Sequence, residues 1–396
     1  MNMKPFARHS LIAAALAALL AGCATDSTTS AAQAPAQSTA ATPAVAVAQA
    51  QVVRQAIAPG LYEIVYSARQ DAVFVASAGG RGEGAPPSRI LRLHPQTLAV
   101  QAEIMLERRG YGLALDDAAG HLYVGNGSDA AVTVIDVATH QTIGSIQLAE
   151  KIKTTNPEGK EVERFPHGFR ELVVDAANHR LYMPGLWFQD SVLYVVDTRS
   201  LKVEKVLSGF GFLATGVTLD TQGGRLYISN QQGQLFTVDT KTLAVSKAEV
   251  DSDQMLNLAF DRSGQRVFAT DQGAQNIEEM RGKQGGIENH RRRGEGNRVV
   301  AFNAADGKLL ASLPTGEGPI AVLVDDAHQR LYVTNRGAGS VSVFDSARNL
   351  PLQTVALPTH PNSLALDARR NALFVTVKNG KDDPRGSNES VARIQF

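Results

Sequence analysis

The sequence predicts an all-β fold, a seven-bladed β-propeller of four-stranded blades. Two strand patterns recur seven times each along the chain, and helical periodicity is absent beyond the N-terminal segment. One four-stranded unit cannot bury both of its faces, whereas seven units packed radially can. A parallel β-helix would need a shorter repeat, and a sandwich would not repeat seven times. The repeat therefore favours the propeller.

The first pattern is an alternating apolar strand, an acidic residue, a tight turn and a second apolar strand. Six clear copies occupy 113–126, 172–185, 217–230, 258–271, 322–335 and 364–377, and one degenerate copy occupies 64–77. The second pattern follows each copy, at 90–97, 132–139, 193–200, 235–242, 299–306, 341–348 and 391–396. A third apolar stretch, such as Thr142–Leu148, follows most of these. Each unit thus supplies four strands.

The two ends of residues 51–396, the expected propeller domain, are complementary. The last unit stops at Phe396 after its third strand, and Val52–Ile57 precedes the first unit. We expect this N-terminal segment to complete the last blade, because pairing the two ends removes an exposed sheet edge.

The first 50 residues read as a membrane anchor and a tether. Lys4 and Arg8 precede an apolar stretch that ends in Leu20-Ala21-Gly22-Cys23, which resembles the lipobox of bacterial lipoproteins. We expect residues 1–22 to be a signal peptide, Cys23 to be lipidated, and residues 23–50 to form a flexible linker. An ordinary secretory peptide is the alternative.

The expected location is the periplasmic side of the cell envelope. Ala24 after the cysteine favours the outer membrane, and the single cysteine excludes a disulfide within the chain. With 39 basic and 39 acidic residues, the chain has no general attraction to nucleic acid or anionic lipid. Any site for a polyanion would have to be local.

A family resemblance rests on two motifs. Tyr332-Val333-Thr334-Asn335 is the YVTN signature of a bacterial propeller repeat family, and residues 359–366 resemble the final-blade motif of its YncE-type periplasmic members. The resemblance covers essentially all of 51–396. It implies a periplasmic seven-bladed propeller without established catalytic activity and linked to DNA binding. The lipobox and the insertion at 272–298 depart from that family pattern.

Strand order predicts where a ligand binds. The long loops at 78–88, 149–169, 272–298 and 378–390 should share one face of the ring, and binding residues usually lie on such loops. The residues that lead into the innermost strands should ring a central funnel there: Tyr62, Glu63, Tyr111, His167, Arg170, Glu171, Thr215, Asn257, His360 and Asn362. The alternative is that these groups only bind neighbouring blades or channel water, which for Arg170 and Glu171 means an ion pair between adjacent blades.

Further candidates lie on the loops themselves. Trp187, beside Phe188, suits stacking on a base, a sugar or a peptide side chain, or else packs against the loop at 149–169. Arg336 is expected to bind ligand at the same face. Phosphate contacts are expected from Lys378 and from Arg291, Arg292 and Arg293 of the insertion, whose alternative is a solvated, mobile loop.

The sequence points to binding rather than catalysis. It contains no His and carboxylate cluster at metal-ligand spacing, no haem attachment motif and no Gly-x-Ser-x-Gly motif. His360 or His167 with Glu171 would form an acid–base pair only if both lined one pocket. We expect no cofactor, metal or catalytic residue, and a monomer. Single-stranded nucleic acid is the leading ligand, with an envelope protein or glycan as the alternative.

Overall fold

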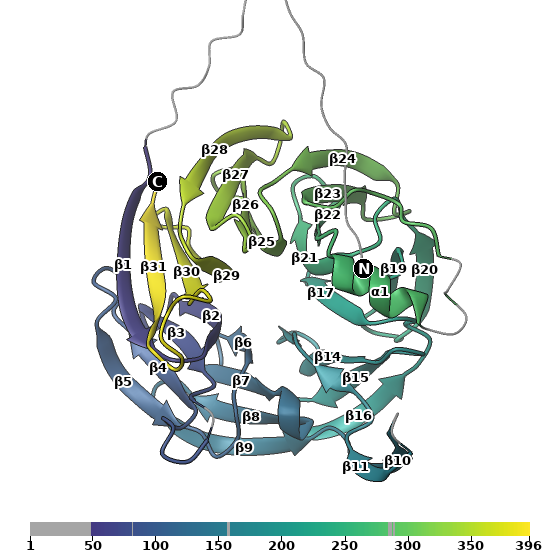
Figure 1. Cartoon of the computed structure of the whole chain (residues 1–396), viewed down its shortest axis with the longest axis horizontal. Helices are drawn as coiled ribbons and strands as arrows, with labels where there is room; N and C mark the ends of the chain where they lie inside the picture. The colour runs from purple at the N-terminus through teal and green to yellow at the C-terminus, as the bar shows by residue number, and fades with distance from the viewer. Residues whose placement is uncertain (1–48, 81, 157–158, 284–286, 288–289) are drawn as a thin grey trace, which may run out of the picture. The chain divides into compact units, whose positions relative to one another are not determined.

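Antiparallel four-stranded sheets are arranged in a ring in the computed structural model, which describes residues 49–80, 82–156, 159–283, 287 and 290–396 (Figure 1). Seven such sheets confirm the predicted seven-bladed propeller. The expected signal peptide, Cys23 and all but the last two linker residues lie outside the described residues.

Blades 1 to 6 take their strands in chain order from the centre of the ring, which we call the channel, outward. Blade 1 holds β2 (Leu61–Ser67), β3 (Ala72–Ser77), β4 (Arg89–Leu93) and β5 (Val100–Met105). Blade 2 holds β6 (Gly112–Asp116), β7 (His121–Asn126), β8 (Ala131–Asp136) and β9 (Gln141–Gln147), with the short helix η1 (Gly127–Asp129). Blade 3 holds β12 (Gly168–Phe169), β13 (Val173–Asp175), β14 (Arg180–Leu186), β15 (Val192–Asp197) and β16 (Lys202–Leu207).

The same order continues around the ring. Blade 4 holds β17 (Ala214–Asp220), β18 (Arg225–Asn230), β19 (Gln234–Asp239) and β20 (Val245–Glu249). Blade 5 holds β21 (Met255–Asp261), β22 (Arg266–Asp271), β23 (Arg298–Asn303) and β24 (Leu309–Pro314). Blade 6 holds β25 (Pro319–Asp325), β26 (Arg330–Asn335), β27 (Ser340–Asp345) and β28 (Leu350–Ala356).

The two chain ends close the ring in blade 7. This blade consists of β29 (His360–Asp367), β30 (Ala372–Lys378), β31 (Glu389–Gln395) and, as its outer strand, β1 (Gln51–Ala58). β1 runs antiparallel to β31 from the Gln51–Gln395 pair to the Ala58–Glu389 pair. The N-terminal strand therefore completes the last blade, as the sequence predicts.

The hydrophobic core lies between blades rather than within them. Seven buried clusters occupy the seven interfaces of the ring, so every blade packs on both neighbours. The blade 7 to blade 1 interface, for example, brings Phe374 and Val391 against Leu61 and Val75. Because each sheet is covered on both faces, its strands consist largely of buried apolar residues.

A threonine on the second strand of three blades ties neighbouring blades together. Thr334, the third residue of the YVTN signature, accepts a hydrogen bond from Ala321 N of its own blade (2.9 Å) and donates one to Asn362 O of the next (3.1 Å). Thr270 and Thr376 make the same two bonds in blades 5 and 7. The signature thus encodes a contact between blades.

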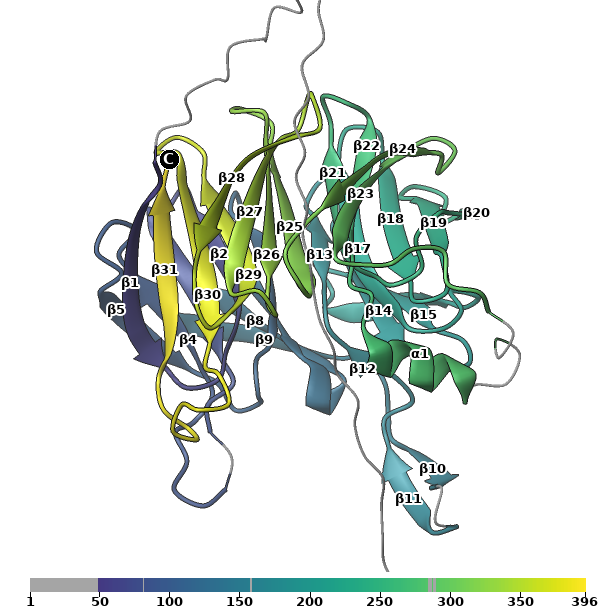
Figure 2. The same cartoon turned by 45° about the horizontal axis from the view of Figure 1, so that its top comes forward.

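The long loops lie on one side of the ring, as predicted (Figure 2). In Figure 2 this side faces downward and carries the hairpin of β10 (Ile152–Thr155) and β11 (Glu161–Arg164), the helix α1 (Gln275–Gly282), and the β3–β4 and β30–β31 loops. The opposite side carries short turns, several closed by an aspartate such as Asp325, whose carboxylate accepts backbone N–H groups of Ala327 and His328. We call the first side the long-loop face and the second the plain face.

The described part of the insertion at 272–298 is docked, which differs from the alternative of a solvated, mobile loop. It contains α1, a helix that the strand patterns do not predict. Arg281 of α1 is 2% exposed and donates to Gln231 O at 2.7 Å. Its guanidinium also contacts the buried carboxylate of Asp253 at 3.3 Å. A buried ion pair therefore fixes the insertion to blade 4 and to the segment that leads into blade 5.

Candidate functional site

A recurring β-bulge places the predicted ring residues at the channel entrance. In blades 1, 4, 5, 6 and 7 the innermost strand loses register with its neighbour just after its first or second residue. The residues within these irregularities include Tyr62, Glu63, Thr215, Asn257 and Asn362. A bulge leaves residues out of the ladder and redirects their side chains. The fold thus repeats one device that frees residues to face the channel.

Blade 3 achieves the same result by interrupting its innermost strand. β12 ends at Phe169 and β13 begins at Val173, so Arg170, Glu171 and Leu172 pair with no strand. Arg170 and Glu171 form an ion pair with 2.7 Å between Nη1 and Oε1. The alternative for these two residues was an ion pair between adjacent blades, but the two side chains pair with each other within blade 3.

The ion pair also reaches across the channel to blade 5. Arg170 Nη2 donates to Asn257 Oδ1 at 2.8 Å, and the Asn257 amide nitrogen donates to the Glu171 carboxylate. Glu171, Asn257 and Glu63 line a small cavity of about 150 Å³, which we call the inner channel cavity. The three side chains therefore close the channel below its entrance.

Both acids of this cavity have raised pKa values. Burial raises the pKa of Glu171 to about 7, with Arg170 opposing and the nearby Glu63 carboxylate reinforcing the shift. Burial also raises the pKa of Glu63, although Ser363 Oγ donates a hydrogen bond to its carboxylate and Arg170 is near. Two carboxylates that share one cationic partner in a poorly solvated channel do not both ionise readily.

Above this closure lies a wider cavity of about 410 Å³, the funnel cavity. Its lining contains Tyr62, Glu63, Tyr111, Phe169, Arg170, Leu256, Gln272, Ile320, Arg336 and Asn362. The Tyr62 and Tyr111 rings meet edge to face, with 4.9 Å between centroids. Five of the predicted ring residues and Arg336 thus meet four further side chains in one mixed polar and aromatic cavity.

The funnel residues that the sequence missed follow a recognisable rule. Phe169, Leu256 and Ile320 are sequence neighbours of predicted ring positions or occupy the equivalent bulge in blade 6. An alignment of the seven repeats at the bulge would have found Ile320. Gln272 begins the insertion, and no repeat pattern covers it.

Arg336 is the exposed cation of the funnel cavity. Within the described part of the chain its guanidinium has no hydrogen-bond or ion-pair partner, and its own carbonyl accepts a hydrogen bond from His360 Nδ1 at 2.9 Å. Arg336 is therefore available to an anionic group, whereas His360 holds the loop that carries it.

Two predicted site residues have internal partners instead. Thr215 is buried and donates to Met255 O of the adjacent blade at 2.7 Å. Lys378 Nζ lies 2.6 Å from Leu61 O and 3.0 Å from the Glu389 carboxylate, and burial lowers the pKa of this ammonium. It also lies 4.0 Å above the Tyr62 ring. A phosphate contact from Lys378 would require these bonds to break.

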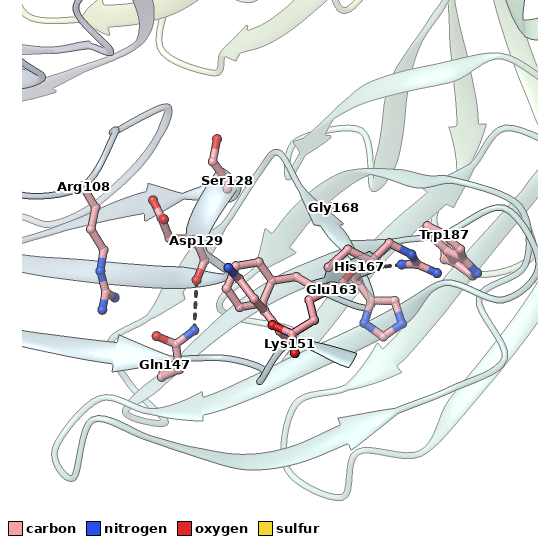
Figure 3. A pocket seen from close by; sticks show the side chains of 12 residues that line it. Arg108, Ser128, Asp129, Gln147, Lys151, Glu163, His167, Gly168 and Trp187 are labelled. Carbon is pink, nitrogen blue, oxygen red and sulfur yellow. Dashed lines mark hydrogen bonds between the residues drawn. The ribbon is translucent and has the colours of Figure 1, made fainter. Parts of the chain in front are cut away.

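A third cavity of about 610 Å³, the hairpin cleft, lies between the β10–β11 hairpin and blades 2 and 3 (Figure 3). Trp187 lines it, but the Arg164 guanidinium of the hairpin lies 3.8 Å from the indole centroid. The packing alternative for Trp187 is therefore present. Arg164 was not predicted, because its place depends on how the hairpin folds back.

The acid–base pairs considered from the sequence do not share a cavity. His167 lines the hairpin cleft, where Nδ1 lies 2.9 Å from Tyr194 Oη, and burial lowers the pKa of this imidazole. Glu171 lines the inner channel cavity, and His360 lines neither. Among the described residues, no group of three or more His, Cys, Asp or Glu is placed to hold a metal ion.

The insertion arginines fall into two classes. Arg293 donates to Gly233 O and Val250 O at 2.9 Å each and pairs with Glu249 at 2.7 Å, so its guanidinium is committed to blade 4 and its flank. Arg291 and Arg292 are exposed. Of the three, these two remain accessible to phosphate.

The fold and its entrance define a seven-bladed β-propeller whose long-loop face opens on a polar and aromatic funnel. No family model matches the chain. A Salmonella typhi protein named YncE is 31% identical over 339 residues, covering 84% of this chain and 86% of that protein. The Escherichia coli O157:H7 YncE is 33% identical over 338 residues, with the same two coverages. The chain belongs to the YncE family.

Solved structures share the fold at low sequence identity. Hydrazine synthase of Kuenenia stuttgartiensis aligns with a TM-score of 0.64 at 16% identity, over 86% of this chain and 96% of that chain. The Cps50 (Swd1) propeller domain of Myceliophteria thermophila aligns with a TM-score of 0.60 at 10% identity, over 88% and 100%. These similarities concern the fold alone.

Proposed function

We propose that this chain is a lipid-anchored, extracytoplasmic binding protein that captures its ligand on the long-loop face. The observation that carries the proposal is the recurring bulge, which turns aromatic and polar side chains from several blades into the funnel cavity. A rigid ring that presents variable loops is a common basis for binding. Neither His167 nor His360 shares a cavity with Glu171, so the acid–base pairs considered from the sequence are not formed.

The ligand class that we propose is single-stranded nucleic acid. The Tyr62 and Tyr111 rings and the unpaired Arg336 guanidinium combine stacking surfaces with a cation, the two features that single strands need. Arg108, Lys151 and Arg164 add positive charge at the hairpin cleft. The near-neutral net charge requires that this attraction be local.

The test is a fluorescence titration of the full chain, purified from membranes in detergent. Trp187 is the only tryptophan, so its emission reports on the hairpin cleft. Single-stranded oligonucleotides should quench it at low salt and less so at moderate salt, and duplexes should act more weakly. Unchanged emission together with flat anisotropy of a labelled strand would reject nucleic acid as the ligand.

An envelope protein or glycan is the second candidate, and the hairpin cleft favours it. One face of Trp187 is covered by Arg164, and Asp129 and Glu163 line the cleft beside the basic residues. Such mixed charge suits a polar partner better than a polyanion. Cross-linking in intact cells, followed by identification of the partner, distinguishes this candidate.

The lipid anchor is tested separately. Changing Cys23→Ser removes the sulfur that would carry the lipid, so the protein should move from the membrane fraction to the soluble periplasmic fraction. Retention of the variant in the membrane fraction would contradict the anchor.

A further inference from the structure

A fourth cavity of about 510 Å³ lies beside the funnel cavity, between the β3–β4 and β30–β31 loops. We call it the two-loop cleft. Tyr62 and Tyr111 line both cavities, so the two tyrosines form their common wall. None of the residues that make the two-loop cleft distinctive was a candidate from the sequence.

Two arginines from different parts of the chain line the two-loop cleft. Arg109 lies between blades 1 and 2, and one of its terminal nitrogens donates to Gly80 O, which fixes the guanidinium against the loop. Arg385 comes from the β30–β31 loop and is exposed, with no side-chain partner among the described residues. Glu83 is the single acidic residue in this lining, so the charged side chains of the cleft carry a net positive charge.

The rest of the lining is unusually small. Gly60, Gly79, Gly80, Gly84 and Gly386 line the cleft together with Ala78 and Ala85. Gly79 has a positive φ of 69°. The loop folds so tightly around it that a Cβ on Gly79 would lie 2.3 Å from Pro86 O. Glycine is therefore required, and backbone rather than side chains forms that wall. A ligand can approach it closely.

We propose that the two-loop cleft binds an oxyanion group, phosphate or carboxylate, between Arg109 and Arg385. Guanidinium groups offer paired N–H donors that match both anions, and Arg109 is already held in place by Gly80. Tyr62 and Tyr111, on the side of the funnel cavity, offer an aromatic surface to the part of the ligand that carries the anionic group. The inference rests on the proposed function only in placing the ligand on the long-loop face.

This site is tested by calorimetric titration of the full chain in detergent, first with inorganic phosphate and then, separately, with malonate. We expect at least one anion to bind, and Arg109→Gln and Arg385→Gln each to weaken its binding by about 10-fold or more, because each variant removes charged hydrogen-bond donors to the anion. Arg348→Gln is the matched control, because Arg348 is an exposed arginine in a turn of the plain face. It should leave the affinity unchanged.

The outcomes separate this site from the proposed ligand. Tighter binding of phosphate or of malonate assigns the source of the oxyanion. No heat with either anion, or equal affinity in wild type and Arg385→Gln, overturns the site, and Arg385 is exposed enough that its variant should fold. If the wild type binds the anion, both variants lose this binding, and oligonucleotides change neither the Trp187 emission nor the anisotropy, the site is supported and nucleic acid is rejected as the ligand.

Discussion

At the scale of single residues, the channel closure concentrates charge where water is scarce. Arg170 neutralises Glu171 and is held by Asn257 across the channel, while Glu63 lies close enough to raise the pKa of Glu171 further. A carboxyl whose pKa is higher in the folded than in the unfolded state binds more protons when folded. Its contribution to stability is therefore present at low pH and is lost as pH rises between the usual 4.5 and about 7.

This sign leads to a prediction for Glu171→Gln. The amide cannot ionise, so the stability of the wild type relative to this variant should fall between pH 5 and pH 8, by an amount on the order of 3 kcal/mol at most. Urea unfolding of both proteins at four pH values measures it. A constant or rising difference across that range would contradict the raised pKa of Glu171.

Thr334 gives a second prediction at this scale. Thr334→Val keeps the shape but removes the acceptor for Ala321 N–H and the donor to Asn362 O, both at the interface of blades 6 and 7. The variant should lose about 1–3 kcal/mol of unfolding free energy, because buried polar groups are left unpaired. Thr334→Ser keeps the hydroxyl and should lose less. Equal stability of the valine variant and the wild type would show that this contact between blades is dispensable.

At the scale of elements, the insertion is the part of the molecule that the sequence interprets least well. Its basic run, Arg291–Arg293, suggests a phosphate-binding loop, yet Arg293 binds carbonyls of blade 4 and its flank, and Arg281 is buried. One acid explains the docking. Asp253 Oδ2 is approached by Arg281 Nη1 at 3.3 Å, His290 Nε2 at 3.0 Å and Arg293 N at 3.1 Å. Nothing local in the sequence marks Asp253, because its partners come from 28 to 40 residues further along the chain.

Asp253→Ala should therefore release the insertion. It leaves the Arg281 guanidinium buried without its carboxylate partner, which typically costs about 3–5 kcal/mol. Urea unfolding measures the loss, and faster tryptic cleavage at the insertion arginines reports the undocking. The neighbouring exposed Asp251→Ala is the control and should behave as wild type. Identical proteolysis of both variants would mean that Asp253 does not hold the insertion.

The bulges show why the ring residues were predictable and their partners were not. Each repeat has a fixed strand order, so residues before the innermost strand must gather at the channel, and Tyr62, Asn257 and Asn362 do. Which of them face solvent depends on local register. Thr215 sits in the same kind of irregularity but bonds to Met255 O and is buried. Strand periodicity cannot distinguish these two results.

At the scale of the whole molecule, closure of the ring was predictable because it follows from counting strands. The seventh repeat lacks its outer strand at the C-terminus, and one spare strand precedes the first repeat. The only arrangement that completes seven blades pairs these two ends, and β1 adopts it. The hairpin cleft and the two-loop cleft were not predictable, since each joins loops from different blades whose paths no repeat dictates.

Deleting residues 52–57 tests the closure. The deletion exposes β31 as a sheet edge and uncovers part of blade 7, so the melting temperature should fall by roughly 10 °C. Deletion of residues 35–40, which belong to the expected linker, is a control of equal length and should leave it unchanged. A melting temperature as high as that of the wild type would mean that the outer strand does not hold the ring closed.

The central claim is that the long-loop face binds the ligand through the funnel cavity, and Tyr111 provides the most direct measurement. The affinity of a labelled single-stranded oligonucleotide for the full chain should weaken by about 10-fold in Tyr111→Ala, since stacking on one aromatic ring contributes about 1–3 kcal/mol per base. Tyr66→Ala, near the plain-face end of β2, should bind as wild type. Equal affinities of the two variants, or no binding by the wild type, would contradict the account.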